Sequence, residues 1–112
     1  MKNNINYSPE AIRDLDEIWE YIAFEFCNTD AAERIVSRIM DTVERLENFA
    51  YTGAMLSSIV DIKSDYRYLV CGDYMAFYRV SEKNIYIDRV LYGKRNYLKV
   101  LFPDMSQKDD EN

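Results

Sequence analysis

The segment that most constrains the fold is residues 66–92, where three short β-type runs are separated by tight turns. The runs at residues 66–71 and 74–80 flank Gly72-Asp73. A glycine in the first turn position favours a type II′ hairpin. The third run covers residues 85–91. Strict alternation would put four of its side chains on one face: Ile85, Ile87, Arg89 and Leu91. These runs predict an antiparallel meander.

Two helical patterns precede the meander. Ser8 and Pro9 fit the N-cap and the first position of a helix, and Asn28-Thr29 marks the start of a second helix. Apolar residues recur at helical spacing in both. The first pattern comprises Ile12, Leu15, Ile18, Trp19, Ile22 and Phe26. The second comprises Ala32, Ile35, Val36, Ile39, Met40, Val43, Leu46 and Phe49. Two amphipathic helices with a short connection predict an antiparallel helical hairpin.

The remaining segments complete the predicted order. Residues 4–7 resemble a short first strand, residues 50–64 a loop with an irregular turn, and residues 96–102 a short helix or edge segment. The order is β-α-α-β-β-β, an α+β fold with the helical hairpin packed on a mainly antiparallel sheet. We expect one domain at residues 1–102 and a disordered acidic tail at 103–112. One sheet face is left without an obvious cover.

Composition supports a self-sufficient domain. With 48% hydrophobic residues the chain should fold without metals or disulfides, so no cofactor and no metal are expected. The isolated Cys27 and Cys71, together with the absence of histidine, argue against a zinc site. No signal peptide and no apolar run long enough to span a bilayer are recognisable. We therefore expect a cytoplasmic protein with no membrane partner.

Charge is distributed unevenly along a chain of net charge −6. Residues 63–99 contain eight basic and four acidic residues, whereas residues 1–62 contain five basic and twelve acidic ones. The acidic total argues against sequence-blind nucleic-acid binding, which depends on positive charge. It leaves room for a local basic surface.

The candidate binding residues follow from this basic segment. A surface that receives a phosphate backbone or an acidic protein would use Arg67, Tyr78, Arg79, Arg89, Lys94 and Arg95. Alternatively the arginines are ordinary edge charges paired with Asp65, Asp73 and Asp88. Tyrosines beside arginines could stack on RNA bases, but tyrosine also suits half-buried strands. The acids Asp14, Asp16, Glu17 and Glu20 are predicted on the solvated face of the first helix.

Several catalytic classes are disfavoured by absences in the sequence. Histidine, the usual general base near neutral pH, does not occur. A glycine-rich phosphate loop and a GxSxG elbow are also missing. An enzyme built on this chain would have to use arginine, lysine, tyrosine or carboxylates.

Three segments carry a resemblance to a known family. They read YSPEAIRDLDEIWEYI, YRYLVCGDYMAFYRV and IDRVLYGKRNYLKVLF, and in this order they resemble the RelE/ParE superfamily of toxins from type II toxin–antitoxin modules. The likeness covers residues 5–102. It implies the β-α-α-β-β-β fold and a growth-inhibiting toxin that a cognate antitoxin neutralises by wrapping it.

The resemblance implies two alternative targets. RelE-like members cut messenger RNA on the ribosome with a basic cluster and a C-terminal tyrosine. Arg95 matches a basic position, Arg67 is the only basic residue where paired lysines would stand, and Tyr97 lies close to the tyrosine position, which falls at residues 101–102. The chain departs from that pattern at Tyr74-Met75, where an arginine would follow the tyrosine. ParE-like members poison DNA gyrase and need no nuclease site. The helix DLDEIWEYI and the strand YMAFYRV favour this branch. A third possibility is a family member that binds its partner and harms nothing.

Overall fold

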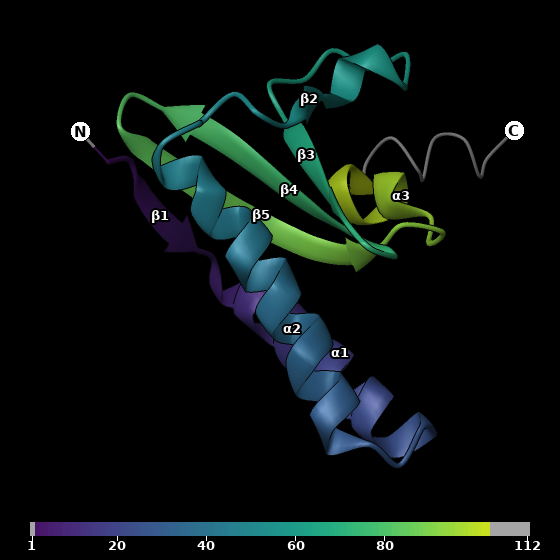
Figure 1. Ribbon diagram of the computed structural model, residues 1–112. Helices are drawn as coiled ribbons and strands as arrows, with labels where there is room; N and C mark the ends of the chain where they lie inside the picture. The colour runs from purple at the N-terminus through teal and green to yellow at the C-terminus, as the bar shows by residue number, and fades with distance from the viewer. Residues whose placement is uncertain (1, 104–112) are drawn as a thin grey trace, which may run out of the picture.

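The computed structural model describes residues 2–103 and contains the predicted order of elements. β1 spans Asn4–Tyr7 and is followed by the helices α1 and α2, at Pro9–Glu25 and Thr29–Glu44. The three long strands are β3 (Arg67–Cys71), β4 (Tyr74–Ser81) and β5 (Asn84–Tyr92). The shorter elements are η1 (Arg45–Glu47), β2 (Ala54–Met55), η2 (Leu56–Ser58) and α3 (Tyr97–Leu101). The structure therefore confirms the α+β class (Figure 1).

The sheet is mixed, with five strands in the order β1-β5-β4-β3-β2. β1 runs parallel to β5, and its pairing ends where Tyr7 meets Ile87. The other neighbouring strands are antiparallel. The helical hairpin lies against the sheet at one end and extends beyond the sheet at the other (Figure 1). β2 lies in the segment that the sequence predicted as a loop with an irregular turn. It pairs through Ala54↔Tyr68 and Met55↔Arg67.

The predicted hairpin turn between β3 and β4 is present. Gly72 has a φ of 63°, whereas no positive φ occurs at Asp73. A positive φ at the first turn residue and a negative φ at the second fit the expected type II′ turn.

The predicted alternation of β5 is wrong because the strand contains a bulge. Phe77 pairs with Arg89 and the next residue, Tyr78, pairs with Ile87, which leaves Asp88 as an extra residue. An inserted residue reverses the faces of the side chains that follow it. Ile85 and Ile87 therefore contact the helix-side core, whereas Leu91 contacts the opposite face.

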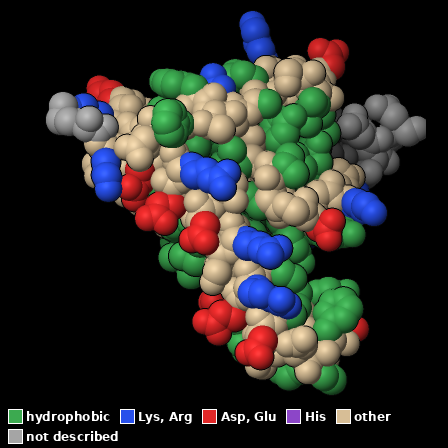
Figure 2. Space-filling view, viewed as in Figure 1, with side chains coloured by type: hydrophobic (Ala, Val, Ile, Leu, Met, Phe, Trp, Pro, Cys, Tyr) green, Lys and Arg blue, Asp and Glu red, His purple; other side chains and the backbone are tan. Residues whose placement is uncertain are grey.

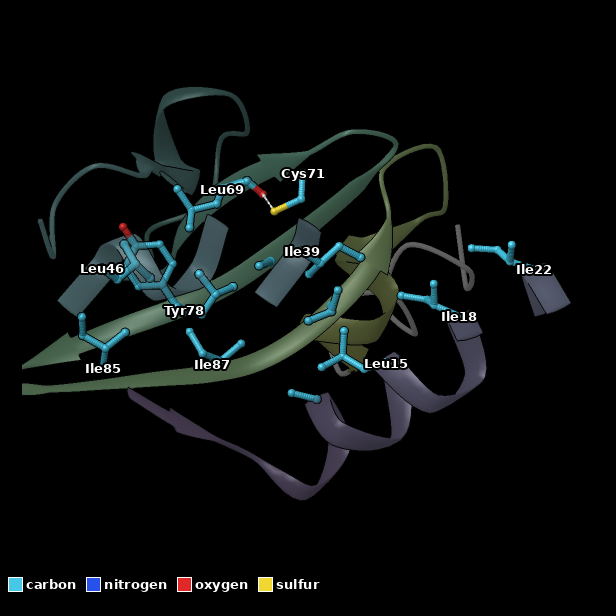
Figure 3. Packing of buried hydrophobic residues seen from close by; sticks show 14 of the residues in the cluster. Leu15, Ile18, Ile22, Ile39, Leu46, Leu69, Cys71, Tyr78, Ile85 and Ile87 are labelled. Carbon is cyan, nitrogen blue, oxygen red and sulfur yellow. Dashed lines mark hydrogen bonds between the residues drawn. The ribbon is translucent and has the colours of Figure 1, made fainter. Parts of the chain in front are cut away.

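The main core lies between the helices and the sheet face that they cover (Figure 3). Its fully buried members include Ile39, Leu46, Ile85 and Ile87. The N-cap of α1 is Ser8, as predicted, and its Oγ accepts a hydrogen bond from the Ala11 N–H. The buried stripe of α1 agrees with the prediction at Leu15, Ile18 and Ile22 and differs at its start and end. Its members are Ala11, Asp14, Leu15, Ile18 and Ile22, whereas Ile12 and Phe26 are exposed.

A second apolar cluster covers part of the other sheet face. Its buried members are Leu56, Met75, Phe77 and Leu91, and side chains of α3 pack against them. The face that the sequence left without a cover is thus partly closed by η2 and α3. The predicted tail lies, apart from Pro103, outside the described residues. No helix within residues 2–103 is long and apolar enough to cross a membrane.

Candidate functional site

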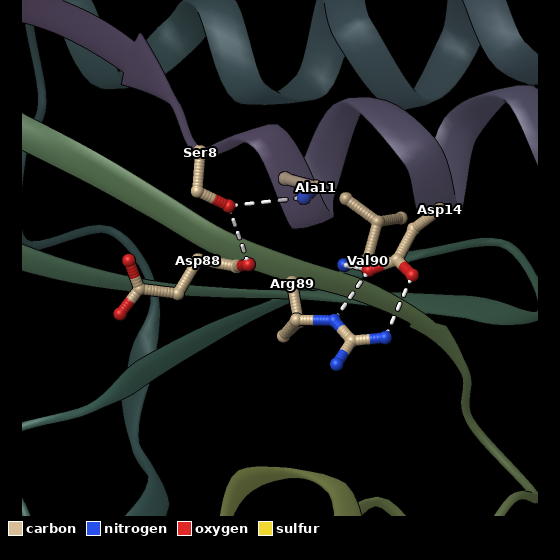
Figure 4. Close-up of polar contacts among 6 residues, drawn as sticks. All are labelled: Ser8, Ala11, Asp14, Asp88, Arg89 and Val90. Atoms are coloured by element: carbon tan, nitrogen blue, oxygen red, sulfur yellow. Dashed lines mark hydrogen bonds and ion pairs between the residues drawn. The ribbon is translucent and has the colours of Figure 1, made fainter.

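Asp14 joins α1 to the strand β5. Its carboxylate accepts two hydrogen bonds from the Arg89 guanidinium, from Nε at 2.7 Å and from Nη2 at 2.8 Å. It also accepts the backbone N–H of Val90 at 2.9 Å. Ser8 completes the junction because its Oγ donates to the Asp88 carbonyl at 2.8 Å (Figure 4). Side chains from the start of α1 therefore form hydrogen bonds with the β5 backbone just past the point where β1 ends.

This junction overturns two expectations from the sequence. Asp14 is 5% exposed, so it is buried and not solvated. Arg89 is held by Asp14, and its side chain is only 26% exposed. The hydrogen bonds to Asp14 also raise the pKa of Arg89 above its ordinary value. We therefore assign Arg89 to holding α1 on the sheet and remove it from the candidate binding surface.

Tyr78 is also removed from that surface because it is fully buried. Its Oη accepts a hydrogen bond from the Gly53 N–H and donates one to the Ala50 carbonyl, both at 2.9 Å. An ideal Cβ at Gly53 would lie 2.5 Å from this oxygen, which explains why the position holds glycine. Tyr78 thus fixes the loop before β2 to the centre of the sheet.

Removal of the Tyr78 hydroxyl should be costly. The Tyr78→Phe substitution leaves the buried Gly53 N–H without its acceptor, and we expect it to lower the free energy of unfolding by about 1–3 kcal/mol. Urea denaturation of the variant against the parent measures this loss. Tyr86→Phe, at a partly exposed position of β5, is the control and should change little. Equal stabilities of Tyr78→Phe and the parent would contradict the assigned role.

Arg67 and Arg79 make different contacts, although Arg67 pairs with the residue before Arg79. Arg67 donates from Nη1 to the Gly53 carbonyl at 2.8 Å, and its guanidinium carbon lies 4.9 Å from the ring centroid of Tyr51. Arg79 forms an ion pair with Asp88 at 2.8 Å. The alternative interpretation, pairing with local carboxylates, therefore describes Arg79.

Tyr66 lies beside the Arg79–Asp88 pair. The Arg79 guanidinium carbon is 5.7 Å from the centroid of its ring. Burial raises the pKa of Tyr66 to about 12, and a hydrogen bond with the Asp88 side chain acts in the same direction. Burial likewise raises the pKa of Tyr7 to about 12.

These two tyrosines predict a loss of stability in strong alkali. Their pKa values are raised in the folded state from an ordinary 10.0, so the unfolded chain releases these protons first. Their contribution to stability is present below pH 10 and disappears as the pH rises toward 12. Chemical denaturation at a series of pH values should show this decline, and Tyr7→Phe with Tyr66→Phe should flatten it. An unchanged slope in the double variant would contradict the assignment.

The three residues matched to a catalytic cluster are not brought together. Tyr97 packs on Phe77 in the second apolar cluster, with ring centroids 5.1 Å apart. Arg67 begins β3 and pairs with Tyr78, whereas Arg95 follows the far end of β5, where Tyr92 pairs with Tyr74. The two β4 positions, Tyr78 and Tyr74, are four residues apart along the strand, about 13 Å. No group of His, Cys, Asp or Glu among residues 2–103 is arranged to hold a metal.

Arg95 and Lys94 are exposed, and Arg95 borders a groove between α1 and the end of β5. We name this the α1–β5 groove. It has a volume of about 300 Å³. Its walls are aromatic, because Tyr74 and Tyr92 meet edge to face at 5.8 Å. The full lining is Asp14, Glu17, Ile18, Tyr21, Tyr74, Val90, Leu91, Tyr92 and Arg95.

The groove also borders an open strand edge. The Val90 N–H points away from β4, because it donates to Asp14. Backbone groups alternate in direction along an antiparallel strand, so the Val90 carbonyl and the Tyr92 N–H face the same side. β1 stops at Ile87 and provides no neighbouring strand there. The groove thus combines apolar walls, one exposed arginine and β5 backbone groups that face away from β4.

The sequence signals for the groove were weak. Tyr21, Tyr74 and Tyr92 come from α1, β4 and β5, so only the folded chain brings them together. Asp14 could have been recognised, because it stands among Ala11, Leu15 and Ile18 at helical spacing. An acid on the buried stripe indicates a specific partner.

Known structures share this fold. A chain of the chromosomal ParDE toxin–antitoxin system from Pseudomonas aeruginosa superposes with a TM-score of 0.68 and 26% identity, covering 81% of this chain and 96% of that one. A chain of the RelBE2 toxin–antitoxin complex from Mycobacterium tuberculosis superposes with a TM-score of 0.60 and 16% identity, covering 82% of this chain and 99% of that one. A chain of the RelE–RelB complex from Pyrococcus horikoshii superposes with a TM-score of 0.56 and 17% identity, covering 85% of this chain and 99% of that one. No curated protein sequence matches significantly.

The fold is that of toxins of the RelE/ParE superfamily. The sequence model of the ParE toxin of the type II toxin–antitoxin system parDE matches residues 5–97. The chain belongs to this ParE toxin family.

Proposed function

We propose that this toxin acts by binding a protein, DNA gyrase, and does not cleave RNA. The observation that supports the proposal is the separation of Arg67, Arg95 and Tyr97. Cleavage of RNA needs groups that converge on one phosphate, activate its 2′-hydroxyl and stabilise the developing charge. In this chain Arg67 contacts the loop at Gly53, Arg95 borders the α1–β5 groove, and Tyr97 packs in the second apolar cluster.

Packing and charge support the same proposal. Met75 and Phe77, which face the second side of the sheet, lie under apolar side chains of α3. α3 therefore keeps an RNA phosphate away from this part of the sheet. The net charge of −6 would also oppose approach to the ribosome, which is largely RNA. Both gyrase and the ribosome are cytoplasmic, so we propose that location as well.

A supercoiling assay tests the proposal. Purified toxin at micromolar concentration should stop gyrase from supercoiling relaxed plasmid or trap it on cleaved DNA. Arg95→Ala should retain the effect on gyrase if the side chain has no catalytic role. Gyrase that remains fully active at micromolar toxin would remove the proposal.

A ribosome-dependent endoribonuclease is the second candidate. It is favoured by the excess of positive charge in residues 63–99 and by the exposure of Lys94 and Arg95. Primer extension on translated message should then show codon-phased cuts that weaken in Arg95→Ala. Intact message during growth arrest would exclude this candidate.

We further propose that the cognate antitoxin neutralises the toxin through the α1–β5 groove. An extended antitoxin segment would pair with the open edge of β5 and place an apolar side chain between the tyrosines. Pull-down of the toxin by the product of the adjacent reading frame tests for this partner. The contribution of the groove itself is tested by the tyrosine variants described in the Discussion.

A further inference from the structure

The far end of the helical hairpin exposes aromatic side chains. Phe24 is 77% exposed and Phe26 is 67% exposed. We call these two residues the aromatic tip. Hydrophobic side chains gather where the hairpin ends, with both acidic and basic side chains near them (Figure 2). The hairpin carries this end away from the sheet (Figure 1), so the phenyl rings contribute little to the core.

The turn that carries the tip is firmly built. Cys27 has a φ of 48°, a left-handed conformation that reverses the chain. The Phe26 N–H donates to the Ile22 carbonyl at 3.1 Å, and the Asn28 N–H donates to the Ala23 carbonyl at 3.2 Å. The Asn28 side chain then caps α2 through the Ala31 N–H at 3.0 Å. A backbone fixed in this way reduces the ordering cost of presenting the rings to a partner.

The charge around the tip indicates which class of partner it can bind. Residues 16–33 contain six carboxylates, and the basic residues Arg13 and Arg34 lie just outside this range. All six are exposed: Asp16, Glu17, Glu20, Glu25, Asp30 and Glu33. Such a surface repels nucleic acid, anionic lipid and a second copy of itself. It is complementary to a cationic protein surface, and enzymes that handle DNA present such surfaces to their polyanionic substrate.

We propose that the aromatic tip is the contact through which the toxin binds its target, a cationic protein surface with an apolar pocket. The inference rests on the proposed function, because it names the surface that would bind gyrase. Aromatic residues at the centre of an interface contribute most of its binding energy. The surrounding carboxylates orient the approach and accelerate association. Phe24 and Phe26 do not line the α1–β5 groove proposed for the antitoxin.

The main test removes the two rings. In Phe24→Ser with Phe26→Ser, we expect the toxin concentration that half-inhibits gyrase to rise about tenfold or more. Affinity for the antitoxin and the thermal unfolding midpoint should stay unchanged. Phe49→Ser is the matched control, because Phe49 is also 67% exposed but lies beyond the other end of α2, which is 16 residues long. Unchanged inhibition by the double variant, or an equal loss of antitoxin affinity, would overturn the inference.

A second variant tests the charge. Glu20 lies one helical turn before Phe24 and therefore on the same face of α1. Glu20→Lys should weaken inhibition about threefold to tenfold, whereas Glu82→Lys makes the same charge change in the turn between β4 and β5 and should have no effect. Stronger inhibition by Glu20→Lys, or equal effects of the two variants, would contradict a cationic partner.

Growth arrest in cells separates this inference from the proposed function. If the parent toxin leaves gyrase active yet stops growth, and the double tip variant does not stop growth, gyrase is refuted as the target while the tip is supported. If the parent inhibits gyrase and the tip variant inhibits it equally, the tip is refuted while gyrase is supported.

Discussion

Replacement of Asp14 by alanine should lower the free energy of unfolding by about 3 kcal/mol, because it leaves Arg89 without its buried partner. We expect the lower part of the range for broken buried ion pairs, since the Arg89 side chain is 26% exposed. The Val90 N–H loses its acceptor at the same time. Such a loss is a large fraction of the total stability of a small domain, about 5–15 kcal/mol.

Three further substitutions complete this measurement. Asp16→Ala changes an exposed acid of the same helix and should shift the stability by about 0.5 kcal/mol or less. Asp14→Asn keeps an acceptor for Val90 and should lose less than alanine. Arg89→Met, alone and combined with Asp14→Ala, completes a double-mutant cycle in urea denaturation. A coupling energy near zero would show that the pair does not hold α1 on the sheet.

The second large effect concerns the antitoxin. Tyr21→Ala with Tyr92→Ala removes two walls of the α1–β5 groove, and we expect the affinity for the antitoxin to fall about 30-fold or more. The variant should remain folded, because both side chains are substantially exposed. If it still inhibits its target, it should be harder to rescue by antitoxin in cells than the parent. Titration calorimetry with the purified antitoxin measures the loss directly.

Tyr86→Ala is the matched control for the groove. Tyr86 is 40% exposed and Tyr92 is 42% exposed, both on β5. Tyr86 does not line the groove, so its removal should leave antitoxin affinity unchanged. Equal affinities of the groove variant and the parent would place the antitoxin elsewhere.

Local signals in the sequence predicted most of the elements. The Ser8 cap, the start of α2 after Asn28 and the Gly72-Asp73 turn each depend on residues that are close in the chain. Their chemistry is decided within one turn of backbone, so sequence spacing is sufficient.

Features that depend on distant partners were mispredicted. The bulge at Asp88 is fixed by pairing with β4 and by Ser8, 80 residues away. It moves Leu91 to the second face, which alternation alone could not indicate. The position of Asp14 on the apolar stripe of α1 indicates a partner, but that partner, Arg89, lies 75 residues later and is identified only in the folded chain. The basic surface was overestimated for the same reason, because Arg79 and Arg89 are paired internally.

The most direct test of the account follows DNA topology and message integrity in the same cells after toxin induction. A toxin that binds gyrase should relax a reporter plasmid or produce double-strand breaks before growth stops, while translated messages stay intact. Co-expression of the antitoxin should restore supercoiling. Codon-phased cuts in messages, with plasmid supercoiling unchanged, would contradict the account.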